Sequence, residues 1–140
     1  MTNASDISEQ QADAWLARYG EVWQTGDADA VTALFAEDAI YHEDPFEPPM
    51  QGRDAIRRYW QEGASDAQED VSFQHRVWAA ARDQCFAHWQ ASFTRVRDGS
   101  RVRLDGVFRL QFRRADDGTV LCTSLQEWWH RREAPAPESA

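Results

Sequence analysis

The stretch from Tyr41 to Gly52, YHEDPFEPPMQG, places three titratable side chains beside a Pro-rich, partly apolar segment. Proline fixes φ and lacks a backbone N–H, so this segment does not fit inside a helix or a central strand. We therefore expect a stiff connection between a strand that ends near Tyr41 and a helix that begins near Arg53. A carboxylate held there beside apolar side chains would have the raised pKa that a general base needs. The alternative is that His42 to Asp44 form a solvated turn.

The composition limits the partners of this chain. Its 140 residues predict one domain. Acidic residues outnumber basic ones by 24 to 15, a net charge of −9, which argues against nucleic acid as a partner because nucleic-acid binders usually carry a basic surface. The chain contains no run of about 18 apolar residues, so no membrane span is predicted. The polar N-terminus lacks the pattern of a signal peptide, so we expect a cytoplasmic protein.

Aromatic residues are unusually frequent, with seven Trp and seven Phe. They imply a large apolar core, a cavity lined with rings or an aromatic interface. Cys85 and Cys122 show no metal-ligand spacing and are expected to be reduced core thiols. The histidines are not spaced so as to require a metal, so we expect neither a metal nor another cofactor.

The first half of the chain has helical patterns. A capping box at Ser8 begins a helix that Gly26 ends. Asp27 can cap a short second helix. The third helix is expected over residues 53–62, and a short strand over residues 39–42 precedes it.

From residue 71 onward, apolar and polar residues alternate as in strands. The expected strands cover residues 71–77, 84–96, 101–113 and 119–131, and Asp-Gly pairs mark two hairpins between them. The order predicts an α+β domain, with three N-terminal helices packed on a curved, mostly antiparallel sheet that encloses a ligand pocket. We expect a flexible leader over residues 1–7, one domain over 8–131 and a disordered tail over 132–140.

Four segments carry a resemblance to a known family: Ala17-Arg18-Tyr19, the turn from Gly26 to Ala30, the segment from Phe35 to Ala39, and Glu43-Asp44-Pro45-Phe46. Together they resemble the NTF2-like superfamily, and within it the ketosteroid isomerases and the SnoaL-like (polyketide cyclase-like) proteins. The resemblance covers about residues 8–131. It implies a cone-shaped α+β fold with an apolar pocket, and a homodimer.

The resemblance also implies site residues. Ketosteroid isomerases use an aspartate base and an oxyanion hole made by a tyrosine and a protonated aspartic acid. The base falls on Asp44 and the tyrosine on Tyr19. Asp105 is the nearest match to the third residue, although strict alternation places it with the arginines, unless a bulge at Gly106 turns it inward. His42 is a further candidate acid or base.

The resemblance thus predicts cofactor-independent acid–base chemistry on a hydrophobic carbonyl compound. The alternatives are a non-catalytic protein that binds a small apolar ligand, and a dimer-forming module that uses Trp89 or Trp129 on the outer sheet face. In the first two cases the expected pocket walls are aromatic: Trp15, Trp23, Phe35, Phe46, Trp60, Phe93, Phe108 and Trp128.

Overall fold

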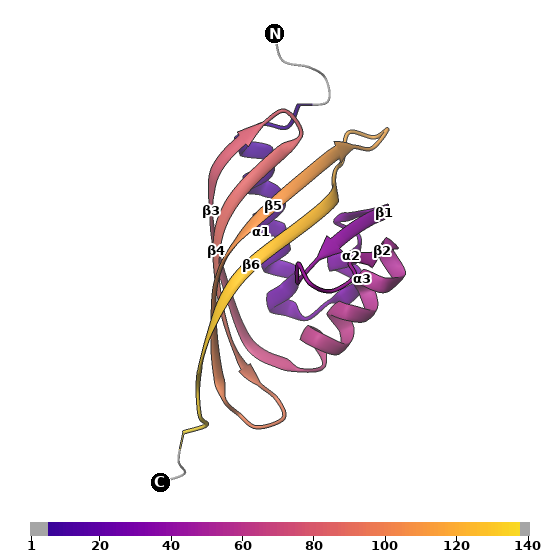
Figure 1. The fold of residues 1–140 in the computed structure, drawn as a ribbon. Coiled ribbons are helices and arrows are strands. Elements are labelled where there is room, and N and C mark those ends of the chain that lie inside the picture. Colours follow the sequence, from indigo (N-terminus) through magenta and orange to yellow (C-terminus); the bar gives the residue numbers. More distant parts are fainter. Residues whose placement is uncertain (1–5, 138–140) are drawn as a thin grey trace.

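The computed structural model describes residues 6–137 and confirms the predicted α+β class. The helices lie together on one side of a long, curved sheet (Figure 1). In chain order the elements are α1 (Glu9–Thr25), α2 (Ala28–Thr32), β1 (Phe35–His42), β2 (Met50–Gln51), α3 (Gly52–Trp60), the π-helix η1 (Gln61–Ser65), β3 (Gln68–Ala81), β4 (Gln84–Arg95), β5 (Arg101–Arg114) and β6 (Val120–Ala134).

The sheet has six strands in the order β2-β1-β6-β5-β4-β3. The four long strands β3 to β6 form an antiparallel meander, and β1 joins it by pairing in parallel with β6. Gly99 and Gly118 have positive φ angles in the turns on either side of β5, where the Asp-Gly pairs predicted hairpins. The first short strand and the last long strand therefore lie side by side although most of the chain separates them.

The predicted bounds of α1 are confirmed. The Ser8 hydroxyl accepts a hydrogen bond from the Gln11 N–H, the Gln11 side chain bonds back to Ser8, and Gly26 ends the helix in the left-handed conformation. Asp27 likewise caps α2 by accepting from the Ala30 N–H. These local signals were sufficient because caps satisfy backbone groups that the helix itself leaves unpaired.

The edges of the domain differ from the prediction. Ile7, expected in a loose leader, is buried in the core, and its N–H donates to the Arg82 carbonyl at 2.6 Å. β6 continues to Ala134, because Arg101 and the residues after it on β5 offer pairing partners beyond residue 131. The rest of the expected leader and tail, residues 1–5 and 138–140, lies outside the described residues.

The helical turns after α3 also run further than predicted. The chain does not stop at Gly63 but continues as the π-helix η1 to Ser65. Ala64, in this extension, is buried against the core, so burial of its methyl group favours the added turn.

The core between helices and sheet is mainly aromatic, and Tyr19 of α1 lies at its centre. Five rings surround the Tyr19 ring with centroids 5.4 to 6.1 Å away, most of them edge-on. Such packing fixes ring positions closely because each aromatic side chain has few rotamers and many contacts. The five rings belong to Trp15, Trp23, Trp60, Phe73 and Phe108.

Gly106 lies where neighbouring strands leave no room for a side chain. It pairs with Trp89 of β4 and Trp129 of β6. A Cβ at this position would lie 2.5 Å from the Trp128 carbonyl oxygen and 2.9 Å from atoms of both Trp89 and Trp129. Only glycine lets the two indole side chains pack over the strand, so Gly106 determines how the inner wall of the sheet is built.

We expect Gly106→Ala to lower the free energy of unfolding by about 1–3 kcal/mol, because the added methyl group must displace backbone and ring atoms. Gly63→Ala is the matched control: no atom lies within 4 Å of the place that its Cβ would occupy, and its φ is not positive. Alanine there should therefore leave stability unchanged or raise it slightly. Urea unfolding followed by tryptophan fluorescence measures both. Equal stability of Gly106→Ala and the wild type would contradict the prediction.

Candidate functional site

A partly open cavity of about 180 Å³ lies between the helices and the inner face of the sheet. Side chains of α1, β1, α3 and strands β4 and β6 contribute to its lining, so it depends on both halves of the chain. Its apolar wall is formed mainly by rings. The polar residues of the lining are Tyr19, Tyr41, Glu43, Tyr59, Gln68, Arg95, Glu127 and Arg131.

Two buried tyrosines face each other in this cavity. The Tyr19 and Tyr41 hydroxyl oxygens are 3.4 Å apart. Burial is the main reason why the pKa of each phenol lies well above its usual range, and the nearby Glu127 raises it further. Both hydroxyls therefore keep their protons. Because each hydroxyl has one proton and Tyr41 already bonds with Tyr19 and Glu127, the Tyr19 hydroxyl is the one that can donate to an oxygen of a bound molecule.

Glu127 is the most unusual group of the site. It lies on β6 with only 7% of its surface exposed. Burial raises the pKa of its carboxyl well above the usual range, the charge of Glu43 raises it further, and a hydrogen bond with Tyr41 opposes these effects. A buried carboxyl with no cationic partner among these causes favours its neutral form. It can thus act as a proton donor.

Glu43 is a second carboxyl in the cavity lining and is only half-buried. Its pKa is raised mainly by burial, lowered by a hydrogen bond with Tyr59, and raised by the neighbouring charge of Asp44. Because Glu43 is less buried than Glu127, it gives up its proton first. Two carboxyls in different surroundings within one cavity can take the roles of base and acid.

A larger, open hollow of about 800 Å³ adjoins the cavity on the side of the Pro-rich connection. It shares Glu43, Glu127 and Trp129 with the inner cavity. Asp44 lines only this outer hollow, where it is exposed and its Oδ1 accepts a hydrogen bond from the Phe46 N–H at 2.9 Å. The structure thus places Asp44 in a local turn, next to the residue that reaches the cavity.

Asp105 lies on the outer face of the sheet. Its carboxylate accepts from Gln90 Nε2 at 2.8 Å and pairs with His88 Nε2 at 2.9 Å, and these contacts lower its pKa. The pairing of β5 with β4 and β6 is continuous through Gly106, so no bulge turns Asp105 inward. His42 is half-buried at the end of β1 and is not part of the cavity lining.

The predicted aromatic walls divide into three groups. Trp23, Trp60 and Phe93 line the cavity. Phe46 is 91% exposed and Trp128 is 49% exposed, and both border the outer hollow. The remaining three are packed in the core behind the cavity: Trp15, Phe35 and Phe108.

Sequence reasoning found Tyr19 but missed the other polar residues of the lining: Tyr41, Glu43, Tyr59, Gln68, Arg95, Glu127 and Arg131. A signal for Glu127 was present, because it alternates with Leu125 and Trp129 on the apolar face of the last strand. A charged residue at an inward position of a strand is rare unless it has a purpose. For Glu43 no such signal exists, because alternation ends where β1 gives way to the Pro-rich connection.

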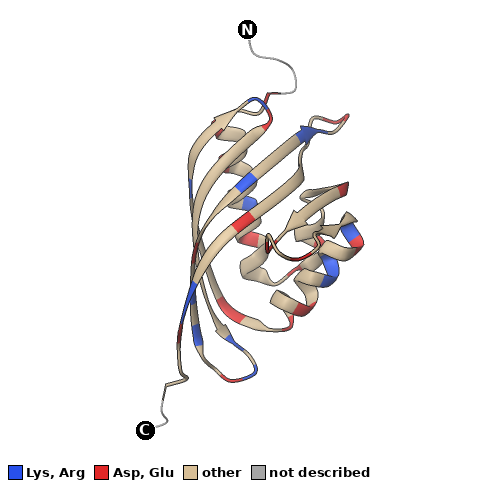
Figure 2. Cartoon of the chain, viewed as in Figure 1, with Lys and Arg blue, Asp and Glu red and all other residues tan. Residues whose placement is uncertain are grey.

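Charged groups elsewhere are dispersed. Basic and acidic residues are interspersed over the helices, strands and turns (Figure 2). Among residues 6–137, no helix is long and apolar enough to cross a membrane. In the same part of the chain, no group of three or more His, Cys, Asp or Glu side chains is placed to hold a metal ion.

Residues 16–121 match the family model of the SnoaL-like domain. This chain belongs to the SnoaL-like family. The family lies within the NTF2-like superfamily, so the resemblance seen in the sequence is confirmed.

Several solved structures have a similar fold, although their sequence identity to this chain is low. SalBIII, an epoxide hydrolase/cyclase-like enzyme with a role in pyran ring formation in the polyether salinomycin, is 23% identical with a TM-score of 0.70, over 88% of this chain and 93% of SalBIII. A ketosteroid isomerase-like protein from Erwinia carotovora atroseptica is 18% identical, with a TM-score of 0.65 over 86% of this chain and 96% of its own. Hexachlorocyclohexane dehydrochlorinase LinA-type3 from Novosphingobium barchaimii is 10% identical, with a TM-score of 0.69 over 89% and 86%.

The buried carboxyl makes a testable contribution to stability. Because the folded-state pKa of Glu127 is raised, its contribution is fully present below the unfolded-state pKa of about 4.3 and is lost as pH rises toward the folded-state value. We expect Glu127→Gln, which stays neutral, to gain about 1 kcal/mol or more over the wild type between pH 4 and pH 8.

Urea unfolding at several pH values measures this difference. Glu62→Gln, a change at an exposed position of η1, is the control and should follow the wild type across the range. A Glu127→Gln curve parallel to the wild type would show that the carboxyl does not carry the expected cost of ionisation.

Proposed function

We propose that this SnoaL-like protein is an enzyme that moves protons on a small, hydrophobic carbonyl compound without a cofactor. The observation that carries the proposal is the buried Glu127 beside the Tyr19–Tyr41 pair in a ring-lined cavity. Burying a carboxyl in such surroundings is costly for folding, and strongly perturbed carboxyls in a cavity are typical of acid–base sites.

The roles follow from the ionisation order. The substrate oxygen accepts hydrogen bonds from the Tyr19 hydroxyl and from neutral Glu127, while Tyr41 bonds with both of these groups. Ionised Glu43, at the open side of the cavity, takes the proton from the carbon next to the carbonyl. The C–H electron pair moves to the oxygen as an enolate, which these donors stabilise, and the proton on Glu43 then returns to carbon. No oxidant, metal or second substrate is needed for this step.

This proposal shifts two roles that the resemblance assigns. The part of base passes from Asp44 to its neighbour Glu43, because Glu43 lines the cavity and Asp44 lines only the outer hollow. The part of the protonated acid passes from Asp105 on β5 to Glu127 on β6, because Asp105 lies on the outer sheet face. Tyr19 keeps the role that the resemblance gives it.

Proton exchange tests the proposal without knowledge of the natural substrate. In D₂O, we expect the wild type to speed the exchange of the α-protons of small ketones such as cyclohexanone and acetophenone, followed by proton NMR. Glu43→Gln and Glu127→Gln should lower the enzymatic rate about 100-fold or more, the usual contribution of acid–base groups. Asp44→Asn is the matched control and should stay within about threefold.

Different outcomes would separate the alternatives. A loss of exchange in Asp44→Asn with full activity in Glu43→Gln would return the role of base to Asp44. Binding of the ketones without any exchange would favour the second candidate, a non-catalytic binding protein for a small apolar ligand, which the ring-lined cavity also supports.

We also propose that the outer sheet face forms a homodimer interface. Trp89 and Trp129, the tryptophans considered from sequence, belong to the inner side, where Trp89 is buried and both line the cavity. The outer face instead carries a row of neighbours across the strands: His88, Val107 and Trp128. Trp78, 59% exposed, extends the row by stacking on His88. Exposed tryptophans in one row are typical of association sites.

Light scattering after size exclusion tests the dimer. The wild type should show twice the 16.1 kDa mass of the chain, and Trp128→Arg should shift it to the monomer, because a charge would be buried without a partner at the interface. Val96→Arg, at an exposed position outside this row, is the control and should stay dimeric. A monomeric wild type, or an unchanged Trp128→Arg dimer, would contradict the proposal.

A further inference from the structure

The lining of the inner cavity is polar at two separate places along the last strand. Glu127, Trp129 and Arg131 are alternate residues of β6, and all three line the cavity. Because a strand advances about 3.4 Å per residue, the backbones of Glu127 and Arg131 lie about 13 Å apart. The carboxyl of Glu127 and the cation of Arg131 thus belong to different ends of one lining.

Apolar side chains lie beside and between these two polar groups. Trp129 separates Glu127 from Arg131 on the inner face of β6, and Leu104 of β5 is the pairing partner of Arg131. Both Trp129 and Leu104 line the cavity. A molecule that spans the lining therefore meets a proton donor at one end, an apolar surface in the middle and a cation at the other end.

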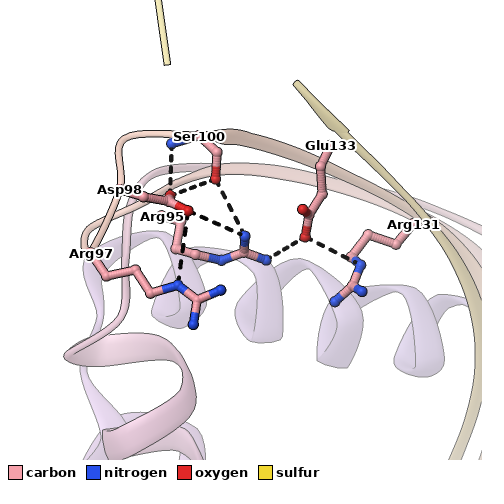
Figure 3. Close-up of polar contacts among 6 residues, drawn as sticks. All are labelled: Arg95, Arg97, Asp98, Ser100, Arg131 and Glu133. Carbon is pink, nitrogen blue, oxygen red and sulfur yellow. Dashed lines mark hydrogen bonds and ion pairs between the residues drawn. The ribbon is translucent and has the colours of Figure 1, made fainter. Parts of the chain in front are cut away.

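This cation belongs to a cluster with an excess of positive charge. Three arginines share two carboxylates in it (Figure 3). The arginines are Arg95, Arg97 and Arg131, and the carboxylates are those of Asp98 and Glu133. The cluster therefore carries one uncompensated positive charge, although the whole chain has a net charge of −9.

Arg95, the other arginine of the lining, is already engaged. Its guanidinium lies 2.5 Å from Glu133, 3.3 Å from the Ser100 hydroxyl and 3.9 Å from Asp98, and its side chain is only 16% exposed. The hydrogen bond from Arg95 is the main reason why the pKa of Glu133 lies below its usual range. Glu133 is therefore primarily the partner of Arg95 rather than of Arg131.

Arg131 keeps one edge of its guanidinium free. Glu133 contacts it through Nε at 3.4 Å, and no acceptor within residues 6–137 contacts its two Nη atoms. Figure 3 shows these Nη atoms pointing away from Glu133. Because the side chain is 52% exposed, a bound molecule can reach this edge. Its parallel N–H donors match the two oxygens of a carboxylate.

We propose that the substrate of this site is a hydrophobic oxo acid whose carboxylate pairs with the Nη edge of Arg131. Its carbonyl oxygen lies at Tyr19 and Glu127, which rests on the proposed function, and its apolar body lies along Trp129. The carboxylate contact rests on the arginine cluster alone. A carboxylate fits better than a doubly charged phosphate ester, because one negative charge balances the one uncompensated charge of the cluster.

Calorimetric titration with a matched pair of ligands tests the carboxylate contact. The ion 3-(4-oxocyclohexyl)propanoate carries a ring ketone and a carboxylate, and its primary amide keeps the shape and the ketone without the charge. At neutral pH, we expect the wild type to bind the acid about three- to tenfold more tightly than the amide, as a charge-assisted pair at a half-exposed site does.

Variants of the cluster identify the cation. Arg131→Gln should abolish the preference for the acid, and Arg131→Lys should keep part of it, because the charge stays while the paired donors are lost. Glu133→Gln should raise the preference, because Arg131 loses its competing carboxylate. Arg97→Gln is the matched control and should retain the preference, because it removes a positive charge of the same cluster outside the cavity lining. A wild-type midpoint of urea unfolding shows that each variant is folded.

Three results would overturn the inference: no binding of the acid, equal affinity of the wild type for acid and amide, or a preference that Arg131→Gln leaves unchanged. Deuterium exchange of the same acid tests the proposed function separately. Exchange that depends on Glu43 without a preference for the acid would remove the carboxylate contact and leave the proposed function intact. Binding that depends on Arg131 without any exchange would retain the contact and reject the proposed function.

Discussion

The burial of the Glu127 carboxyl is the constraint on which the site depends. An ionised carboxylate in an aromatic interior would cost several kcal/mol, a large part of the stability of one domain. The neutral form and the hydrogen bond with Tyr41 reduce that cost. Tyr41 in turn meets Tyr19, so the polar groups form a chain of contacts inside an apolar wall. This row of hydrogen-bonded side chains needs rigid surroundings, because a buried polar group that loses its partner lowers the stability of the fold.

The aromatic core supplies that rigidity. Tyr19 touches five rings, and its hydroxyl is therefore held from the side of α1 while the sheet holds Glu127. The sheet has its own close contact at Gly106, where two indoles approach the strand. Rings of both the helices and the sheet fix Tyr19, because Phe73 of β3 and Phe108 of β5 are among its neighbours, and the cavity lies between the two layers. Function here depends on packing more than on any single loop.

The sequence allowed the architecture to be predicted but only part of the site. Caps, Asp-Gly turns and alternation are local signals, and Ser8, Gly26 and Gly99 confirmed them. Tyr19 was assigned to the site by the resemblance, and the structure places it in the buried core. Alternation also placed Asp105 outside correctly, as its contacts with His88 and Gln90 show. Periodicity works wherever one face of an element is buried.

The proposed base was harder to predict because it follows the end of a strand. Glu43 and Asp44 are adjacent, and at a Pro-rich connection neither a period of two nor one of 3.6 decides which side chain turns inward. The turn that Asp44 makes with the Phe46 N–H became visible only in three dimensions. Ile7 and Ala64 were missed for a related reason: their burial depends on partners far along the chain, which no local pattern encodes.

The parallel pairing of β1 with β6 has a consequence for how the protein matures. Tyr19, Tyr41 and Glu43 are made early in translation, whereas Glu127 arrives with the last strand, which must insert between β1 and β5. Contacts of such long sequence separation form slowly because a large loop has to close first. A nascent chain that has formed its helices and the β3–β5 meander still exposes the apolar inner face of an incomplete sheet. Chaperones would bind the protein in that state. Chemical competence and completion of the sheet are therefore one event.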